Sequence, residues 1–222
     1  MTRDLQLADI EISIGNRALV ALSVAIGAGQ VLTIMGPSGS GKSTLLSAIT
    51  GTLDKAFALR GQIRLSGQDI TQLPTRARRI GILFQDDLLF PHLSVAANLA
   101  FGLPQACKGR DLRQSMIDAA LTAVDLQGYG PRDPATLSGG ERARVALMRC
   151  LLSEPSVLLL DEPFSRLDAG LRQSIRHLVF SHARARELPV ILVTHDPADA
   201  LAAAGPVLSP LGVTLSLTPE QP

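Results

Sequence analysis

Eight consecutive residues, Gly36 to Ser43, constrain the fold of this chain more than any other segment. Their sequence, GPSGSGKS, fits the pattern G-x-x-x-x-G-K-[ST] of a phosphate-binding loop. The apolar residues 31–35 before it have the length and β-branched content of a buried strand, and residues 44–49 after it are typical of a helix that Gly51 is suited to end. A glycine- and serine-rich turn can match this pattern by chance, but the flanking strand and helix are the context that a P-loop requires.

The residue types of this loop suit the binding of a polyphosphate. Glycines let backbone N–H groups approach the phosphates, and the start of the next helix adds unpaired donors and a favourable dipole. Lys42 supplies a positive charge for the β- and γ-phosphates, and the Ser43 hydroxyl is suited to bind Mg²⁺. The predicted nucleotide-binding residues here are Gly36, Pro37, Ser38, Gly39, Ser40, Gly41, Lys42, Ser43 and Thr44.

The rest of the chain repeats the pattern of strand and helix. Four apolar runs without polar alternation predict buried strands, at 31–35, 80–84, 157–160 and 190–193. Such strands are typical of a mostly parallel sheet that is covered on both faces, so we expect an α/β fold. Residues 5–14 and 19–26 predict two further strands that are joined by a turn at Gly15, and residues 62–66 predict a half-exposed strand. Arg76 to Arg79 carry three positive charges, for which a solvated face is the simplest interpretation.

Residues from about 89 to 154 interrupt this pattern because they predict helices only. In the helix predicted over 111–125, the apolar residues that recur at three- and four-residue spacing are Leu112, Met116, Ala119, Ala120 and Ala123. We therefore expect one domain over residues 1–222, with a core lobe of about 1–88 and 155–222 and an inserted all-α subdomain of about 89–154. The core lobe is expected to contain an N-terminal antiparallel β subdomain.

Polar residues that follow the predicted buried strands are further candidates for the site. Two adjacent carboxylates, Asp161 and Glu162, come directly after a buried strand, where they are costly unless a cation or a reaction uses them. Asp161 is suited to hold Mg²⁺, and Glu162 to orient and polarise an attacking water. Gln85 and His195 also follow strands, where an amide can contact Mg²⁺ and water and a histidine can donate to a γ-phosphate. From local sequence alone, the simpler interpretation of Gln85 and His195 is a structural one.

A second helix start has the chemistry of an anion site. The segment 137–141, LSGGE, places Ser138 before two glycines at the beginning of a helix that continues through Arg149. The chain thus offers two phosphate-binding helix starts but one lysine-containing loop. This imbalance suggests that the second start serves a nucleotide that is held by another chain.

Taken together, these motifs resemble those of the ATP-binding cassette (ABC) transporter ATPases, over about residues 5–205. The matching elements are the Walker A loop 36–43, the Q-loop Gln85, the signature 137–141, the Walker B strand 157–161, the catalytic Glu162, the D-loop 165–168 and the switch His195. The signature discriminates best, because most other P-loop NTPases lack it. The resemblance implies a RecA-like P-loop NTPase fold.

The resemblance also implies a head-to-tail homodimer that holds two ATP molecules at its interface. In that arrangement Glu162, His195, Gln85 and Lys42 are catalytic, and Ser43, Gln85 and Asp161 hold Mg²⁺. Ser138 and Gly140 close on the γ-phosphate of the ATP that the other subunit holds, and Gly139 and Asp168 are included with them as nucleotide-binding residues. ATP binding is expected to shut the dimer and hydrolysis to reopen it.

The implied function is that of the ATPase subunit of an importer for a small solute, at the cytoplasmic face of the inner membrane. Its expected partners are integral membrane permease subunits and, as a further candidate, an extracytoplasmic solute-binding protein. Residues 84–101 are the expected permease contact, where Leu88, Leu89, Phe90 and Leu93 either form an interface patch or pack within the domain.

Two other classes of function compete with the importer. In the first, the same dimer drives a membrane protein that moves no solute, as in lipoprotein release or cell-wall control. The second is a soluble protein that acts on DNA or ribosomes. The net charge of +1 argues against nucleic acid as a partner. Family members that act on chromosomes also carry a long coiled coil between the two halves of the site, whereas here Lys42 and Asp161 are only 119 positions apart, with no heptad tract between them.

Two residues depart from the family pattern. Arg166 stands in the D-loop where a small residue is usual, and a long cation at a dimer interface either pairs with a carboxylate or repels its symmetry mate. The family also places an aromatic ring near residue 14, where it stacks on adenine. Here Ile14 precedes Gly15, and no Phe, Tyr or Trp occurs before Phe57.

The missing ring predicts a change in nucleotide affinity. Base–aromatic stacking is worth about 1–3 kcal/mol, so Ile14 should hold the base less well than an aromatic residue does. We predict weaker nucleotide binding and reduced discrimination of ATP over GTP, to be measured as the two dissociation constants. A strong preference for ATP at low-micromolar affinity would contradict this prediction.

Overall fold

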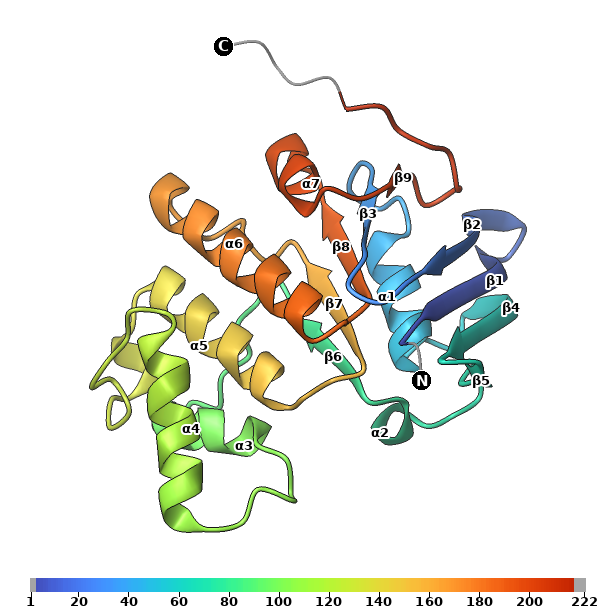
Figure 1. Ribbon diagram of the computed structural model, residues 1–222. Helices are drawn as coiled ribbons and strands as arrows, with labels where there is room; N and C mark the ends of the chain where they lie inside the picture. The colour runs from blue at the N-terminus through green and yellow to red at the C-terminus, as the bar shows by residue number, and fades with distance from the viewer. Residues whose placement is uncertain (1–2, 218–222) are drawn as a thin grey trace. The chain divides into compact units, whose positions relative to one another are not determined.

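The computed structural model describes residues 3–217 and divides into two compact units (Figure 1). The first unit comprises Met1–Ile80, Ser156–Glu162 and Arg176–Pro222, and the second comprises Gly81–Pro155 and Pro163–Ile175. The residues that the sequence predicts as a helical insertion, about 89–154, all belong to the second unit. That unit also takes in residues 81–88 and 163–175. Within the described residues, no helix is long and apolar enough to cross a membrane.

The first unit contains the expected N-terminal antiparallel sheet. Its strands are β1 (Leu5–Ile14), β2 (Arg17–Ile26), β4 (Phe57–Leu65) and β5 (Gln68–Asp69), in the order β2-β1-β4-β5. β1 pairs antiparallel with both β2 and β4, and its buried residues alternate until a register shift between Leu7 and Ile10. β4 begins five residues before the strand predicted from the sequence, at Phe57.

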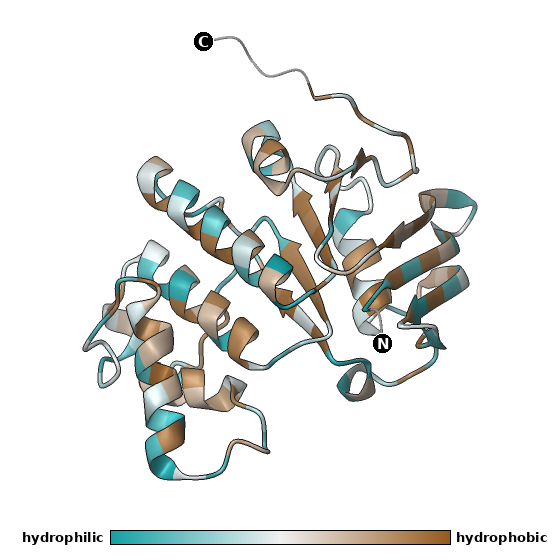
Figure 2. Ribbon diagram, viewed as in Figure 1, coloured by the Kyte–Doolittle hydropathy of each residue, from teal (hydrophilic) through white to brown (hydrophobic). Residues whose placement is uncertain are grey.

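A parallel sheet forms the centre of the first unit. Its strands β7 (Val157–Asp161), β8 (Val190–Thr194), β3 (Val31–Met35) and β9 (Val207–Leu208) lie side by side in that order. All three pairings are parallel, and the first four residues of β3 and β7 and all five of β8 are buried. Figure 2 shows these strands as the most hydrophobic part of the unit. Because the strands are parallel, the P-loop after β3 and the polar residues after β7 and β8 lie at the same edge of the sheet.

Helices complete the first unit and form most of the second. The first unit holds α1 (Lys42–Thr50), α2 (Thr75–Arg78) and α7 (Pro197–Ala203). The second holds the end of β6 (Ile80–Leu83), α3 (Val95–Gly102), α4 (Arg110–Thr122), a short 3₁₀ helix (Pro134–Thr136) and α5 (Gly139–Leu152). α6 (Ala169–Ala185) begins in the second unit and ends in the first.

The helix predicted over 111–125 is confirmed as α4, but its predicted apolar row is wrong in part: Ala120 is buried and Met116 half-buried, while the other members are exposed. Leu112 is 54% exposed and Ala119 is exposed, whereas the buried positions are Ile117, Ala120 and Leu121. A helix offers several rows of residues at three- and four-residue spacing, and neighbouring rows differ by one position. The row with the larger branched side chains is buried, because it removes more apolar area from water.

One arginine of the predicted solvated cluster is buried. Arg78 is 4% exposed, and its guanidinium donates to the carbonyl oxygens of Ala48 and Ile49, at 2.8 and 2.7 Å. It also donates to the carbonyls of Thr71 and Leu73, at 2.7 and 2.8 Å. Two of these four carbonyls belong to the last turn of α1, the helix that follows the P-loop. A cation there satisfies orphan carbonyls and complements the helix dipole.

Gly51 makes room for this arginine. It ends α1 in a left-handed conformation with φ of 79°, as its position after the helix predicts. A Cβ atom at this position would lie 2.7 Å from the Arg78 guanidinium carbon. The residue that ends the helix must therefore be glycine for two reasons, its backbone conformation and the space that Arg78 occupies.

We predict that Arg78→Met lowers the free energy of unfolding by about 3 kcal/mol, because it removes four hydrogen bonds to backbone carbonyls, of which the Ala48 carbonyl still accepts from the Gly51 N–H. Arg76→Met is the matched control, since Arg76 is exposed in the same short helix. Urea unfolding of both variants measures the difference. Losses that agree within about 0.5 kcal/mol would show that Arg78 acts as an ordinary surface residue.

Candidate functional site

The P-loop has the backbone geometry that its glycines require. β3 ends at Met35 and α1 begins at Lys42, so the intervening residues form the turn. Gly41, immediately before the helix, has φ of 99°, and a Cβ atom there would lie 2.9 Å from the Leu19 carbonyl oxygen of β2. Glycine is therefore needed both for the conformation and for the close approach of β2 to the start of α1.

Lys42 crosses the inside of this loop. Its Nζ donates to the carbonyl oxygens of Gly36 and Pro37, at 2.8 and 2.9 Å, and the residue is only 7% exposed. An ammonium group has three donors, so one remains for a ligand in the loop. The sequence predicts a positive charge at Lys42. The structure adds that this ammonium group is held inside the loop by the Gly36 and Pro37 carbonyls.

Ser43 and Asp161 meet at the carboxyl edge of the parallel sheet. The Ser43 hydroxyl donates to Asp161 Oδ2 at 3.3 Å. Burial raises the pKa of the Asp161 carboxyl and the neighbouring Glu162 carboxylate raises it further, while the hydrogen bond from Ser43 and the charge of Lys42 lower it. A partly buried carboxylate beside a hydroxyl offers the hard oxygen ligands that Mg²⁺ prefers.

Two protein groups are few ligands for a metal ion, and Mg²⁺ in a nucleotide site needs no more. Mg²⁺ in nucleotide sites is usually held by one or two protein groups, together with phosphates and waters. Ser43 and Asp161 are sufficient for that mode of binding.

The structure joins Glu162 to His195. His195 Nδ1 lies 3.1 Å from Glu162 Oε1, and the side chains are 67% and 20% exposed. The Glu162 N–H donates to the Val193 carbonyl oxygen of β8 at 2.9 Å. Glu162 has φ of 48°, a left-handed conformation that costs a non-glycine residue roughly 1–2 kcal/mol. This conformation turns the chain immediately after β7, one residue beyond Asp161.

Ile14 lies at the end of β1, in the unit that carries the P-loop. Its side chain is aliphatic and the residue is 42% exposed. The position is thus open to a ligand, and it offers dispersion contacts but no aromatic stacking surface.

The signature residues begin α5 in the second unit. Ser138 Oγ accepts from the Glu141 N–H at 3.3 Å, and Glu141 Oε2 accepts from the Ser138 N–H at 2.7 Å. This is a capping box, and the hydrogen bond from the Ser138 backbone lowers the pKa of the Glu141 carboxyl below its usual range. Gly139 and Gly140 form the first turn. Asp168 Oδ1 accepts from the Leu171 N–H at 3.0 Å near the start of α6.

The segment after Gln85 is held by arginines of the same unit. Arg142 Nε of α5 donates to Asp87 Oδ2 at 2.8 Å, and Arg149 donates to the carbonyls of Asp87 and Leu88, at 3.2 and 3.0 Å. Arg166 forms an ion pair with Asp86, so the unusual D-loop cation pairs with a carboxylate of its own chain. The sequence left the partner of Arg166 open and did not predict the roles of Arg142 and Arg149.

The apolar residues near Gln85 are divided between packing and exposure. Phe84, Leu88 and Phe101 are 44%, 55% and 69% exposed, whereas Leu89, Phe90 and Leu93 are half-buried. Phe90 lies edge-on against Phe101, with ring centroids 4.7 Å apart. Of the four apolar residues that the sequence singles out, only Leu88 is exposed, and the permease contact stays a prediction.

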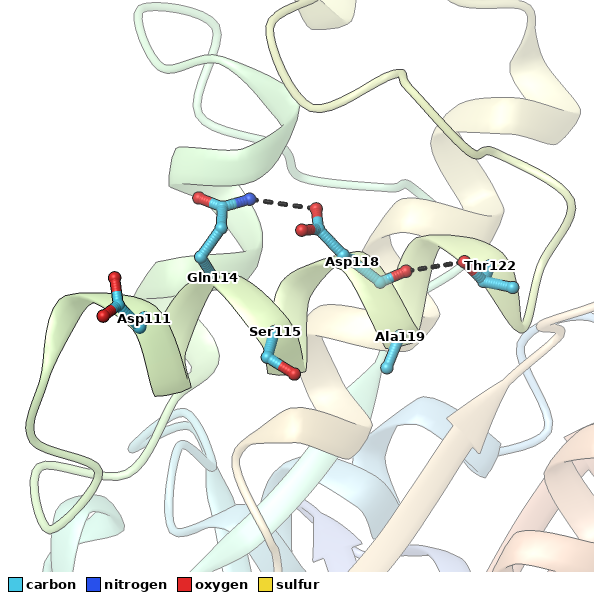
Figure 3. A pocket seen from close by; sticks show the side chains of 6 residues that line it. All are labelled: Asp111, Gln114, Ser115, Asp118, Ala119 and Thr122. Atoms are coloured by element: carbon cyan, nitrogen blue, oxygen red, sulfur yellow. Dashed lines mark hydrogen bonds between the residues drawn. The ribbon is translucent and has the colours of Figure 1, made fainter.

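A separate hollow of about 570 Å³ lies along α4 (Figure 3). Its lining residues all belong to that helix, and they are Asp111, Gln114, Ser115, Asp118, Ala119 and Thr122. Gln114 donates to Asp118 at 2.9 Å on this face. With no lining residue from another element, the hollow lacks the convergent groups of a ligand site.

The predicted site residues are therefore distributed over the two units. In the first unit, the structure brings together Lys42 with the P-loop carbonyls, Ser43 with Asp161, and Glu162 with His195. The second unit carries the remaining predicted site residues, Gln85, Ser138, Gly139, Gly140 and Asp168. Gln85 is exposed after β6, and Ser138 is exposed before α5.

Known proteins resemble this chain in sequence. Residues 19–165 match the family model described as ABC transporter. The chain is 50% identical to the Escherichia coli (strain K12) ABC transporter ATP-binding protein YnjD, which is described as uncharacterized, over 83% of this chain and 84% of that protein. It is 45% identical to the sulfate/thiosulfate import ATP-binding protein CysA of Caulobacter vibrioides, over 84% of this chain but 56% of that relative, so it spans little more than half of CysA.

A solved structure has the same fold. It is described as a dimeric, post-hydrolysis state of the ATP-binding cassette MJ0796 bound to ADP and Pi. The TM-score is 0.80 at 27% identity, and the match covers 92% of this chain and 93% of that one. The predicted P-loop NTPase fold is thereby confirmed.

Proposed function

Because this chain belongs to the ABC transporter family, we propose that it is the subunit that binds and hydrolyses ATP to power an importer for a small solute. The observation that carries this proposal is the convergence of three contacts at one edge of a parallel sheet. Lys42 donates to the P-loop carbonyls, Ser43 donates to Asp161, and Glu162 contacts His195. The importer assignment is also supported by the likeness to CysA, whose name describes sulfate and thiosulfate import.

Each of these residues has a role in hydrolysis. Lys42 and the P-loop N–H groups hold the β- and γ-phosphates. Ser43 and Asp161 would hold Mg²⁺, which would neutralise charge on the phosphate oxygens. Glu162 orients a water in line with the γ-phosphorus and accepts its proton. The bond from the γ-phosphorus to the bridging oxygen breaks, and ADP and phosphate form. His195 donates a hydrogen bond to a γ-phosphate oxygen.

The second phosphate-binding helix start completes the site of another copy. In the proposed homodimer, Ser138, Gly139, Gly140 and Asp168 face the ATP that the other subunit holds, and closure of the dimer follows ATP binding. The Ser138 hydroxyl accepts a hydrogen bond from the Glu141 N–H, so its own proton is available to a phosphate oxygen. The dimeric state described for MJ0796 supports this assembly.

The membrane partner is a permease that contacts the segment from Phe84 to Phe101. Support comes from the exposure of three apolar side chains in this segment, Phe84, Leu88 and Phe101. Arg142 and Arg149 bind this segment to α5, the helix that begins with the signature residues. A displacement of the segment by a permease would therefore be transmitted to those residues within the same unit. The chain is then a peripheral protein at the cytoplasmic face of the inner membrane, and an extracytoplasmic solute-binding protein is a further candidate partner.

We predict that a Glu162→Gln chain binds ATP, does not hydrolyse it and accumulates as a closed dimer. Adding Ser138→Arg should keep this chain monomeric with ATP, because a long cation fills the space at the start of α5. Ser115→Arg is the matched control, since Ser115 is exposed on α4. Light scattering after size exclusion measures the mass. A Ser138→Arg chain that dimerises as fully as the control would exclude the sandwich dimer.

The permease is tested with the same trapped chain. Tagged Glu162→Gln protein with ATP should recover a multi-span permease from native membranes, with or without a solute-binding protein, and adding Lys42→Ala should abolish recovery because productive ATP binding is lost. A partner with few spans and a large outer domain would replace the importer with a mechanotransmission complex. Recovery that is unchanged by Lys42→Ala would contradict ATP-driven coupling.

A further inference from the structure

An ion-pair network contacts the two residues that flank His195 in the chain. Asp199 of α7 is 3% exposed, and its Oδ2 accepts from the Thr194 hydroxyl at 3.0 Å. Arg176 of α6 forms an ion pair with Asp199 Oδ1, and its guanidinium lies 3.8 Å from Asp196 Oδ2. The Arg176 side chain is only 14% exposed. All four residues belong to the first unit, which also holds Glu162.

This network fixes the chain on both sides of His195. On one side, Thr194 is 1% exposed and is held by Asp199. On the other side, the Asp196 N–H donates to the Thr194 hydroxyl at 3.1 Å, and Asp196 Oδ1 caps α7 by accepting from the Ala198 N–H at 2.8 Å. His195 itself is exposed, so packing does not determine where its ring lies. The direction of its Cα–Cβ bond is set by the backbone that its two neighbours anchor.

A buried ion pair usually adds little to the free energy of unfolding. Replacing such a pair with apolar residues of similar volume is often neutral or stabilising, since burial removes both charges from water. What charged hydrogen-bonding groups provide is direction, because their geometry is narrow. Here these contacts orient residues 194–196, whose backbone places the His195 ring 3.1 Å from Glu162.

We propose that Arg176 and Asp199 are positioning residues for His195 in ATP hydrolysis. They hold the backbone of residues 194–196 so that the imidazole reaches Glu162 and the γ-phosphate. This inference rests on the proposed function, because it requires His195 to take part in the reaction. It adds a support between α6 and α7 in which Asp199 is buried and the Arg176 side chain is 14% exposed.

The test is a double-mutant cycle on the Mg²⁺-dependent ATPase activity of the full chain. Asp199→Asn should lower kcat roughly 10- to 100-fold, the cost of misplacing a reacting group by about 1 Å, and should change KM for ATP less than about twofold. In a His195→Ala background the same substitution should change kcat less than about twofold, since no imidazole remains to be positioned. Asp118→Asn, on the exposed face of α4, is the matched control.

A second variant separates positioning from folding. Arg176→Met combined with Asp199→Val removes both charges together with a smaller change in volume, so no buried charge is left unpaired and the chain should still unfold in one cooperative thermal transition. We expect this variant to lose kcat as Asp199→Asn does. Wild-type kcat in this folded variant would overturn the inference.

The outcomes also separate this inference from the proposed function. An Asp199→Asn effect of equal size with and without His195 would overturn the positioning role and leave the proposed role of His195 intact. A His195→Ala chain with wild-type kcat would overturn both.

Discussion

The candidate site depends on the parallel pairing of β7 with β8, which the hydrogen bond from the Glu162 N–H to the Val193 carbonyl extends by one residue. This pairing aligns the carboxyl ends of two strands that are separated by about thirty residues in the sequence. Asp161 and Glu162 on one strand then meet Thr194 and His195 on the next. The left-handed conformation of Glu162 is the local cost of turning the chain there, and the sheet on either side maintains it. If β8 slipped by one residue, every contact at this edge would change.

Buried and half-buried arginines hold connecting segments within each of the two units. Arg78 donates to carbonyls in the last turn of α1, at the opposite end of the helix from Lys42. Arg176 supports the loop that carries His195, and Arg142 and Arg149 hold the segment after Gln85. In each case a planar cation with several donors fixes irregular backbone that apolar side chains could not orient. Segments that carry predicted site residues are thus held in place by hydrogen bonds and ion pairs from arginine side chains.

The phosphate end and the base end of the site differ in how they are built. The P-loop, Lys42 and the Ser43–Asp161 pair supply directed polar contacts, whereas Ile14 supplies only dispersion contacts to whatever lies on it. The described residues thus offer more directed contacts to a phosphate group than the Ile14 side chain offers to a base.

The sequence by itself determined the fold class, the P-loop and the polar residues at the strand ends, because apolar runs, glycines and charged residues each have local physical causes. It also predicted the helix over α4, but not which row of that helix is buried. The contact between Glu162 and His195, the burial of Arg78 and the pairing of Arg166 with Asp86 were decided by the tertiary structure alone. An arginine has the same local sequence signal whether it lies in water or under a helix. Only the packing of distant segments determines which carbonyls and carboxylates surround it.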